Sequence, residues 1–154
     1  STAAIIHIGA IPVFVDVLPD QNIDPYKIEA SITEKTKAVM PVHLTGRMCD
    51  MDPIMDIAKK HGLVVIEDAA QSVGARYKGK PSGLIGDVGC FSTHPLKNLN
   101  ACGDGGFLTT NDEVIYKVTI LNIDNKSKIL DLNTSCITTH EVIEGRAKVL
   151  LLNS

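Results

Sequence analysis

The sequence predicts an α/β fold, with a mostly parallel sheet flanked by helices. Apolar runs of strand length alternate with helical patterns at the spacing of βαβ units. One of these runs, Leu63–Ile66, shows no alternation of apolar and polar residues, as expected for a strand that is buried on both faces. With 154 residues the chain is long enough for one domain with its own core.

The first part of the chain predicts two helices and two strands. A helix is expected from Ser1 until Gly9 stops it. Asp24 is a candidate N-cap for a second helix, with Pro25 in its first turn and apolar residues as far as Ile32. The strands are expected over residues 11–17, with a proline near the start, and over residues 36–43.

The middle of the chain continues the alternation. Asp50 is expected to cap a helix that Gly62 ends, followed by the strand 63–66. Further strands are expected over residues 88–91 and 105–110. Asn111 and Asp112 then cap a helix that runs to Leu121. Beyond residue 122 the pattern weakens to strand character over residues 132–139 and a helix over residues 141–152.

The composition excludes several classes of function. The 15 basic and 18 acidic side chains give a net charge of −3 without a basic block, so neither nucleic acid nor an anionic membrane is expected as a partner. No apolar run reaches the roughly 20 residues of a membrane span, and no signal peptide is expected. The four cysteines form no C-x-x-C pair, so we expect no metal site, no disulfides and a cytoplasmic protein; they are Cys49, Cys90, Cys102 and Cys136.

Polar side chains follow the predicted strands at the points where these end. They are His43, Asp68 with Gln71, and Ser92 with Lys97. Ligands of parallel α/β sheets bind beyond the carboxyl ends of the strands, so one common site is expected there.

An amine, a carboxylate and a hydroxyl at one sheet edge suit pyridoxal 5'-phosphate. On this hypothesis Lys97 forms the Schiff base and later moves the proton, and Asp68 pairs with the pyridinium. Gln71 contacts the ring oxygen and Ser92 binds the phosphate. Spacing alone favours the more ordinary interpretation, in which these are solvated charges and turn residues and His43 is a polar group at a strand end with its hydrogen bonds satisfied.

Three motifs resemble those of the DegT/DnrJ/EryC1/StrS aminotransferases: residues 65–72 (VIEDAAQS), 91–99 (FSTHPLKNL) and 103–106 (GDGG). Residues 8–16, 41–46 and 49–52 also fit, so the similarity runs from residue 1 to about residue 121. These are fold-type I pyridoxal-phosphate enzymes that aminate nucleotide-linked keto sugars. The resemblance implies the roles given above to Asp68, Gln71, Ser92 and Lys97.

The resemblance also implies a reaction type. Related sugar dehydratases have a histidine in place of the lysine, so Lys97 favours transamination over a dehydratase-like or regulatory relative. The implied donor is an amino acid, glutamate first, and the implied assembly is a homodimer. His94 is expected to line the site or the subunit contact, and His43 and His94 are candidates for contact with the substrate.

The chain departs from the family at both ends. Residues 1–121 resemble part of the cofactor-binding large domain, and residues 122–154 resemble a diverged tail of it. A preceding phosphate-binding segment and the small C-terminal domain are both expected to be absent. A second hypothesis is therefore a truncated, non-catalytic remnant that folds or binds a partner without turnover.

Overall fold

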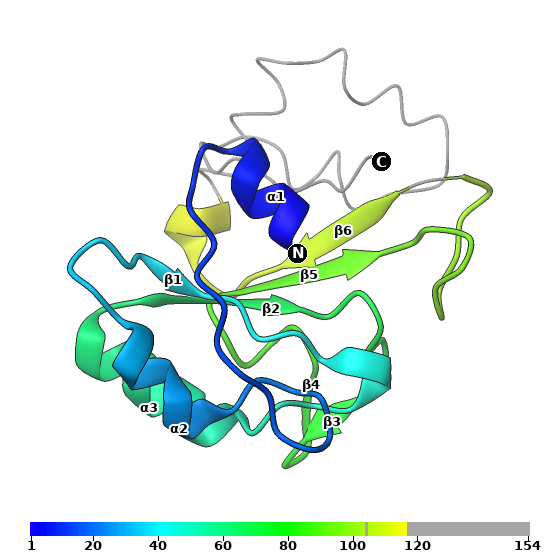
Figure 1. Ribbon diagram of the computed structural model, residues 1–154. Coiled ribbons are helices and arrows are strands. Elements are labelled where there is room, and N and C mark those ends of the chain that lie inside the picture. Colours follow the sequence, from blue (N-terminus) through cyan, green and yellow to red (C-terminus); the bar gives the residue numbers. More distant parts are fainter. Residues whose placement is uncertain (104, 117–154) are drawn as a thin grey trace.

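The structure, a computed structural model, describes residues 1–103 and 105–116. A four-stranded sheet forms its centre, in the order β1-β2-β5-β6 (Figure 1). The strands are β1 (Ala38–Val39), β2 (Val64–Asp68), β5 (Val88–Ser92) and β6 (Gly106–Thr109). β1, β2 and β5 are parallel to one another, whereas β6 is antiparallel to β5. The predicted mostly parallel α/β sheet is confirmed.

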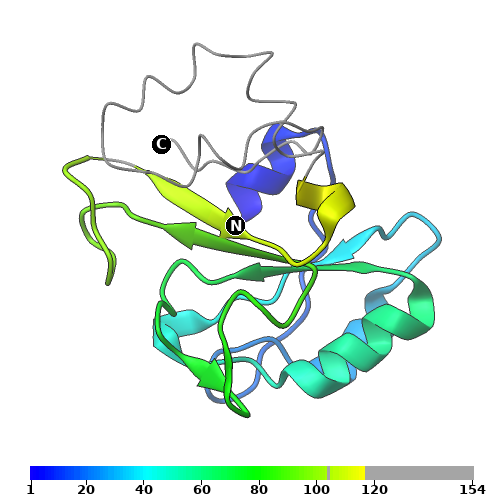
Figure 2. The same cartoon turned by 180° about the vertical axis from the view of Figure 1, so that it is seen from behind.

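Helices lie on both faces of this sheet. α1 (Thr2–His7) lies on one face, and α2 (Pro25–Ile28) and α3 (Met51–His61) lie on the other, as the two opposite views show (Figures 1 and 2). Two 3-10 turns, η1 (Glu29–Ser31) and η2 (Leu44–Gly46), follow α2 and β1. The link from β2 to β5 contains a hairpin of β3 (Arg76–Tyr77) and β4 (Lys80–Pro81), on the same side as α2 and α3.

The core fills the space between α2, α3 and the sheet. α3 contributes Ile54 and Ala58, which are four residues apart and therefore share a face. The other buried members are Ile28, Val39, Cys49, Met51 and Val65. Gly62 ends α3 in the left-handed conformation with φ 64°, which confirms the predicted helix end.

The two predicted N-caps differ in the structure. Asp24 caps α2 as expected, because its carboxylate accepts the N–H of Tyr26 at 3.0 Å. Asp50 precedes α3, but its side chain makes no capping bond. Instead the hydroxyl of Tyr77 accepts the N–H of Asp52 at 3.3 Å and donates to Asp50 at 2.6 Å. Asp50 therefore holds the N-cap position as predicted, but its side chain makes no capping bond, and the β3–β4 hairpin brings the hydroxyl of Tyr77 there instead.

Two predicted strands also differ. The run 36–43 pairs with β2 on both sides of Pro41, through Ala38–Val39 and an isolated bridge at Val42, because a proline has no N–H to continue the ladder. The run 11–17 forms no sheet strand, and its one pairing is the bridge from Val17 to Ile23. Apolar content predicts a strand only where a neighbouring backbone is available to pair with it.

The later elements are described in part. β5 and β6 confirm the strands expected over residues 88–91 and 105–110. Residues 113–116 are helical, and Asp112 accepts the N–H groups of Val114 and Ile115 at 2.7 and 2.9 Å, which confirms its capping role. The remainder of that predicted helix, and all elements expected after residue 122, fall outside the described residues.

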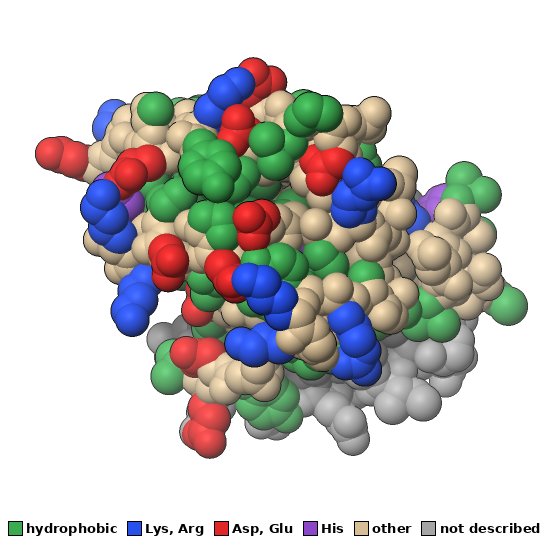
Figure 3. Space-filling view, turned by 90° about the horizontal axis from the view of Figure 1, so that it is seen from below, with side chains coloured by type: hydrophobic (Ala, Val, Ile, Leu, Met, Phe, Trp, Pro, Cys, Tyr) green, Lys and Arg blue, Asp and Glu red, His purple; other side chains and the backbone are tan. Residues whose placement is uncertain are grey.

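The surface carries charges of both signs. On the face seen in Figure 3, basic and acidic side chains are interspersed around exposed apolar groups. Among the described residues no helix has the length and apolarity to cross a membrane, and no cluster of three His, Cys, Asp or Glu could hold a metal ion.

Candidate active site

The strand ends that carry the predicted site residues meet at one edge of the sheet. β2 ends at Asp68 and β5 ends at Ser92, and Asp68 is in register with Cys90 on β5. On its other side Asp68 pairs with Val42, directly before His43. The topology therefore brings together the segments that begin at His43, Asp68 and Ser92, as the order of the strands predicts.

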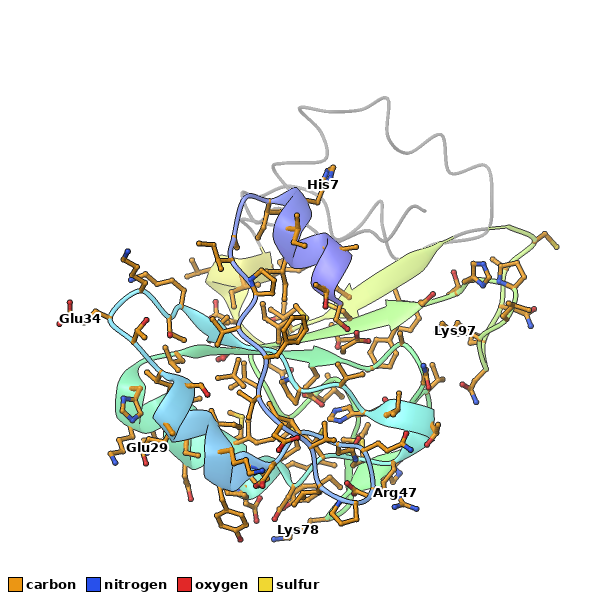
Figure 4. The ribbon with its side chains drawn as sticks, viewed as in Figure 1. His7, Glu29, Glu34, Arg47, Lys78 and Lys97 are labelled. Atoms are coloured by element: carbon orange, nitrogen blue, oxygen red, sulfur yellow. The ribbon has the colours of Figure 1, made fainter. Side chains whose placement is uncertain are left out.

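A cavity of about 350 Å³ lies at this edge. It is lined by Thr45, Gln71, Leu96, Lys97 and Asn98. Lys97 is half-buried and comes from the loop that follows β5 (Figure 4), and Gln71 comes from the loop that follows β2. Two of the predicted site residues, Gln71 and Lys97, thus line one cavity, whose volume is within the range of small-molecule sites.

The loop after β1 fixes the position of Gln71. The N–H of Thr45 donates to Oε1 of Gln71 at 2.9 Å. Thr45 reaches this position in the left-handed region, with φ 55°. Within residues 1–103 and 105–116 the amide nitrogen of Gln71 makes no hydrogen bond, so it is available to donate to a ligand.

Asp68 lies at the same edge but does not line the cavity. Its side chain is 14% exposed, and Oδ1 accepts the N–H of Ala70 at 3.1 Å. Oδ2 accepts the hydroxyl of Ser1. The carboxylate is therefore held by hydrogen bonds on the α1 side of the sheet.

A tight turn after β5 presents Lys97. Oγ of the buried Ser92 accepts the N–H of His94 at 3.2 Å, and Nδ1 of His94 accepts the N–H of Leu96 at 3.1 Å. The carbonyl of His94 accepts the N–H of Lys97 at 2.8 Å. His94 thus shapes the turn, and Ser92, which accepts here, keeps its own proton to donate.

His43 is placed differently from the expectation. Its side chain is fully buried, with Nε2 at 2.9 Å from Glu67 and Nδ1 accepting the N–H of Cys49 at 3.2 Å. Both ring nitrogens are therefore occupied inside the protein. The expected contact with a substrate is incompatible with this placement. A polar residue at the end of a strand can face the protein interior as well as the solvent.

Glu67 is the residue whose importance the sequence did not reveal. Its buried carboxylate accepts four hydrogen bonds, from His43 and from the backbone N–H groups of Gly83, Ile85 and Gly86 at 2.6–2.9 Å. Burial opposes ionisation, but these donors outweigh it and hold the pKa of Glu67 below its usual range. The alternation of side chains along a strand could have indicated this. Adjacent residues such as Glu67 and Asp68 face opposite sides of the sheet, so the two carboxylates cannot share one environment.

Thr93 was also not singled out. It is buried, and its hydroxyl has no hydrogen-bond partner among the described residues. A Cβ on Gly105 would lie 2.7 Å from this hydroxyl, so only glycine fits there without displacement.

The fold and the site define a class: an α/β domain with a lysine and an amide in a cavity at the carboxyl edge of its sheet. The sequence profile of the DegT/DnrJ/EryC1/StrS aminotransferase family matches residues 1–128. The chain belongs to this family, as the motifs predict.

Individual relatives agree. The chain is 56% identical over 114 residues to the pleiotropic regulatory protein of Geobacillus stearothermophilus, covering 73% of this chain and 31% of the relative. It is 52% identical over 114 residues to GDP-perosamine synthase of Caulobacter vibrioides, covering 73% and 30%. Among solved structures, the aminotransferase from Psychrobacter cryohalolentis matches with a TM-score of 0.71 and 45% identity, covering 78% of this chain and 33% of that one. The chain thus spans about a third of the length of these relatives.

Proposed function

We propose that the protein transfers an amino group from an amino acid, glutamate first, to a keto sugar carried on a nucleotide, with pyridoxal phosphate as cofactor. The observation that carries this proposal is the cavity that Lys97 and Gln71 both line, at the edge where Asp68 and Ser92 end their strands. Several relatives are named for nucleotide-linked sugars, among them the GDP-perosamine synthase and a UDP-N-acetyl-3-dehydro-alpha-D-glucosamine 3-aminotransferase of Acidithiobacillus ferrooxidans.

The residues present fit the cofactor by their chemistry. Lys97, which lines the cavity, supplies an amine, and Gln71 supplies a free amide N–H₂ for an oxygen on the ring. Asp68, at the same edge of the sheet but outside the cavity lining, supplies a carboxylate for a protonated ring nitrogen. Ser92 supplies a hydroxyl proton for the phosphate. A related structure, ntda of Bacillus subtilis, is described with bound pyridoxamine phosphate and has a TM-score of 0.67 and 36% identity to this chain.

When bound, pyridoxal phosphate supplies an aldehyde that reacts with amines and a ring that withdraws electrons from the bonds beside them. Lys97 would hold the cofactor through its amine. Once free, that amine would take the proton from the donor α-carbon and later give a proton to the sugar carbon that receives the nitrogen. Asp68 favours the protonated ring by its charge. Overall the amino group and a hydrogen pass from the donor to the carbonyl carbon of the sugar. The carbonyl oxygen of the sugar leaves as water, and water supplies the carbonyl oxygen of the donor's keto acid.

We further propose that the full protein is a cytoplasmic homodimer, with His94 at the site or at the contact between subunits. The turn 92–97 supports this assignment, because it carries the exposed Leu96, which lines the cavity together with Lys97. Three free cysteines among the described residues fit a reducing compartment.

Attachment of the cofactor is the direct test. The chain is mixed with pyridoxal phosphate, reduced with borohydride and digested, and mass spectrometry locates the pyridoxyl group. We expect the label on Lys97 and its loss in Lys97→Ala, with full labelling of Lys35→Ala, in which an exposed lysine is replaced. Labelling elsewhere, or labelling that survives Lys97→Ala, overturns the assignment.

Turnover separates the two hypotheses on function. Glutamate is added to the loaded protein and 2-oxoglutarate is measured, and we expect one equivalent per bound cofactor. If the label on Lys97 forms but no 2-oxoglutarate appears, the non-catalytic remnant is the better description.

A further inference from the structure

We propose that the buried pair of Glu67 and His43 positions the cavity, by fixing the turn that holds Gln71. This inference rests on the proposed function only in its cofactor readout; the geometric link can be measured without the cofactor. Glu67 and His43 do not line the cavity, so they are positioning residues and not catalytic ones.

The carboxylate of Glu67 is the anchor of this arrangement. Oε1 accepts the N–H groups of Ile85 and Gly86 at 2.7 and 2.6 Å. Oε2 accepts from Gly83 at 2.8 Å and from Nε2 of His43 at 2.9 Å. Every lone-pair direction of an ionised carboxylate is therefore used, and the imidazole is fixed to the link between β2 and β5.

The tautomer of His43 follows from its two partners. Nδ1 accepts the N–H of Cys49, so the proton of a neutral ring resides on Nε2 and points to Glu67. The backbone of His43 is fixed as well, because its N–H donates to the carbonyl of Asp68 at 3.1 Å. The side chain of His43 is thus bound to Glu67 and its main chain to Asp68, which are consecutive residues of β2.

The turn that starts at His43 carries this constraint to the cavity. The N–H of Gly46 donates to the carbonyl of His43 at 3.4 Å, which closes the turn. Between them Thr45, at φ 55°, directs its N–H to Oε1 of Gln71. Thr45 and Gln71 both line the cavity. A tilt of the imidazole would therefore move one wall of the cavity.

Two variants test the pair. In Glu67→Gln an N–H₂ group replaces one carboxylate oxygen. Whichever oxygen it replaces, this donor then faces two other donors: His43 and Gly83 at one position, or Ile85 and Gly86 at the other. His43→Gln keeps a donor toward Glu67 but loses the acceptor for Cys49, so it perturbs the pair more gently and guards against failure of the first variant to fold. Asp87→Ala is the matched control: this carboxylate holds the same link to β2 by accepting the N–H of Val65 at 2.7 Å, at the far end from the cavity.

The first readout is the cofactor-free protein. In ¹H–¹⁵N spectra we expect both variants to shift the backbone amide of Thr45 and the side-chain amide of Gln71, whereas Asp87→Ala leaves them in place. Unshifted signals in folded Glu67→Gln and His43→Gln overturn the proposal. So does an equal shift in the control, because it would mean that general destabilisation is the cause.

The second readout is the dissociation constant of pyridoxal phosphate, followed by absorbance below the melting temperature of each variant. Partners that orient a ligand-binding side chain change affinity by roughly ten- to a hundredfold when removed. We expect a loss of about tenfold for His43→Gln and no loss for Asp87→Ala. Absence of binding by the unmodified chain contradicts the proposed function alone, because the spectral shifts still decide the positioning role.

Discussion

Gly83 and Gly89 are in direct backbone contact. A Cβ on Gly89 would lie 2.3 Å from both Cα and the carbonyl oxygen of Gly83, and 2.5 Å from Oγ1 of Thr109. This contact presses the link between β2 and β5 against the sheet at the point where Glu67 binds the N–H of Gly83. Because neither Gly83 nor Gly89 has a side chain, the non-helical link between β2 and β5 can pack directly on β5.

Gly83→Ala is expected to destabilise the fold. The new methyl group would lie 2.5 Å from the ring of Phe91, in a residue whose φ is 77°. We expect a loss of about 1–2 kcal/mol from the left-handed backbone and a further 1–3 kcal/mol from overpacking. Urea unfolding measures the sum.

Gly74→Ala is the matched control for this prediction. Gly74 has φ 83° but nothing within 4 Å of its Cβ position, so only the backbone cost of about 1–2 kcal/mol applies. Equal losses in the two variants would show that the contact with Phe91 relaxes freely.

Tyr77→Phe is expected to weaken the start of α3. The hydroxyl replaces an N-cap side chain by accepting the N–H of Asp52, and it also donates to Asp50. Losing a cap costs about 1 kcal/mol, and the melting temperature reports it. Tyr26→Phe, on an 82% exposed ring whose hydroxyl has no partner among the described residues, should be neutral. A neutral Tyr77→Phe would mean that water replaces the hydroxyl without cost.

Acid is expected to destabilise the protein through Glu67. The donors around it hold its pKa below that of the unfolded chain, so its stabilisation is complete above the ordinary value of about 4.3 and is lost as the pH falls through the lower folded value. Glu67→Gln should remove this part of the pH dependence. Urea unfolding between about pH 6 and pH 3 measures the slope in both proteins.

High salt should separate the pH-dependent stabilisation by Glu67 from that of the exposed carboxylates. The pKa values of Asp16, Glu29 and Asp52 are also lowered, mainly by hydrogen bonds to lysines, but these carboxylates are exposed. In about 0.5 M salt, where the Debye length is roughly 4 Å, their share should fade while that of Glu67 remains. A pH dependence that is identical in Glu67→Gln would contradict the assignment.

The thiols are expected to differ in reactivity. Burial raises the pKa of Cys49 and of Cys90 to about 12, and the nearby Asp68 and Glu67 add to the effect at Cys90. Cys102 is exposed. In a Cys136→Ser background at pH 8, iodoacetamide should label Cys102 and leave the other two unmodified until urea is added. Rapid labelling of Cys90 in the folded protein would show that β5 separates transiently from its neighbours and exposes this thiol.

The sequence predicted most of the sheet because parallel strands are recognisable one at a time. Leu63–Ile66 and Val88–Phe91 are continuous apolar runs, and both lie in strands of the central sheet. The cavity followed from the same logic, since the carboxyl ends of neighbouring strands must meet. Gln71 and Lys97 line it, whereas Asp68 and Ser92 lie at the same edge outside its lining.

What failed depends on partners that a single stretch of sequence does not show. Residues 11–17 have the composition of a strand but pair only at Val17. His43 looked like a ligand-facing residue because the carboxylate that binds it is 24 residues away. The cap of α3 comes from Tyr77, on a hairpin that the sequence did not predict.

Glu67 and Asp68 are neighbours with opposite orientations, one bound inside the protein and one at the site edge. Deleting or inserting a single residue within β2 would exchange them, placing an aspartate among the donors of the link and a glutamate on the α1 side. A change of two residues in β2 would keep both orientations, whereas a change of one residue would have to be absorbed by a bulge. Among related proteins, insertions should accumulate at the exposed tip of the hairpin around Lys78 and Gly79, and β2 should keep a constant length.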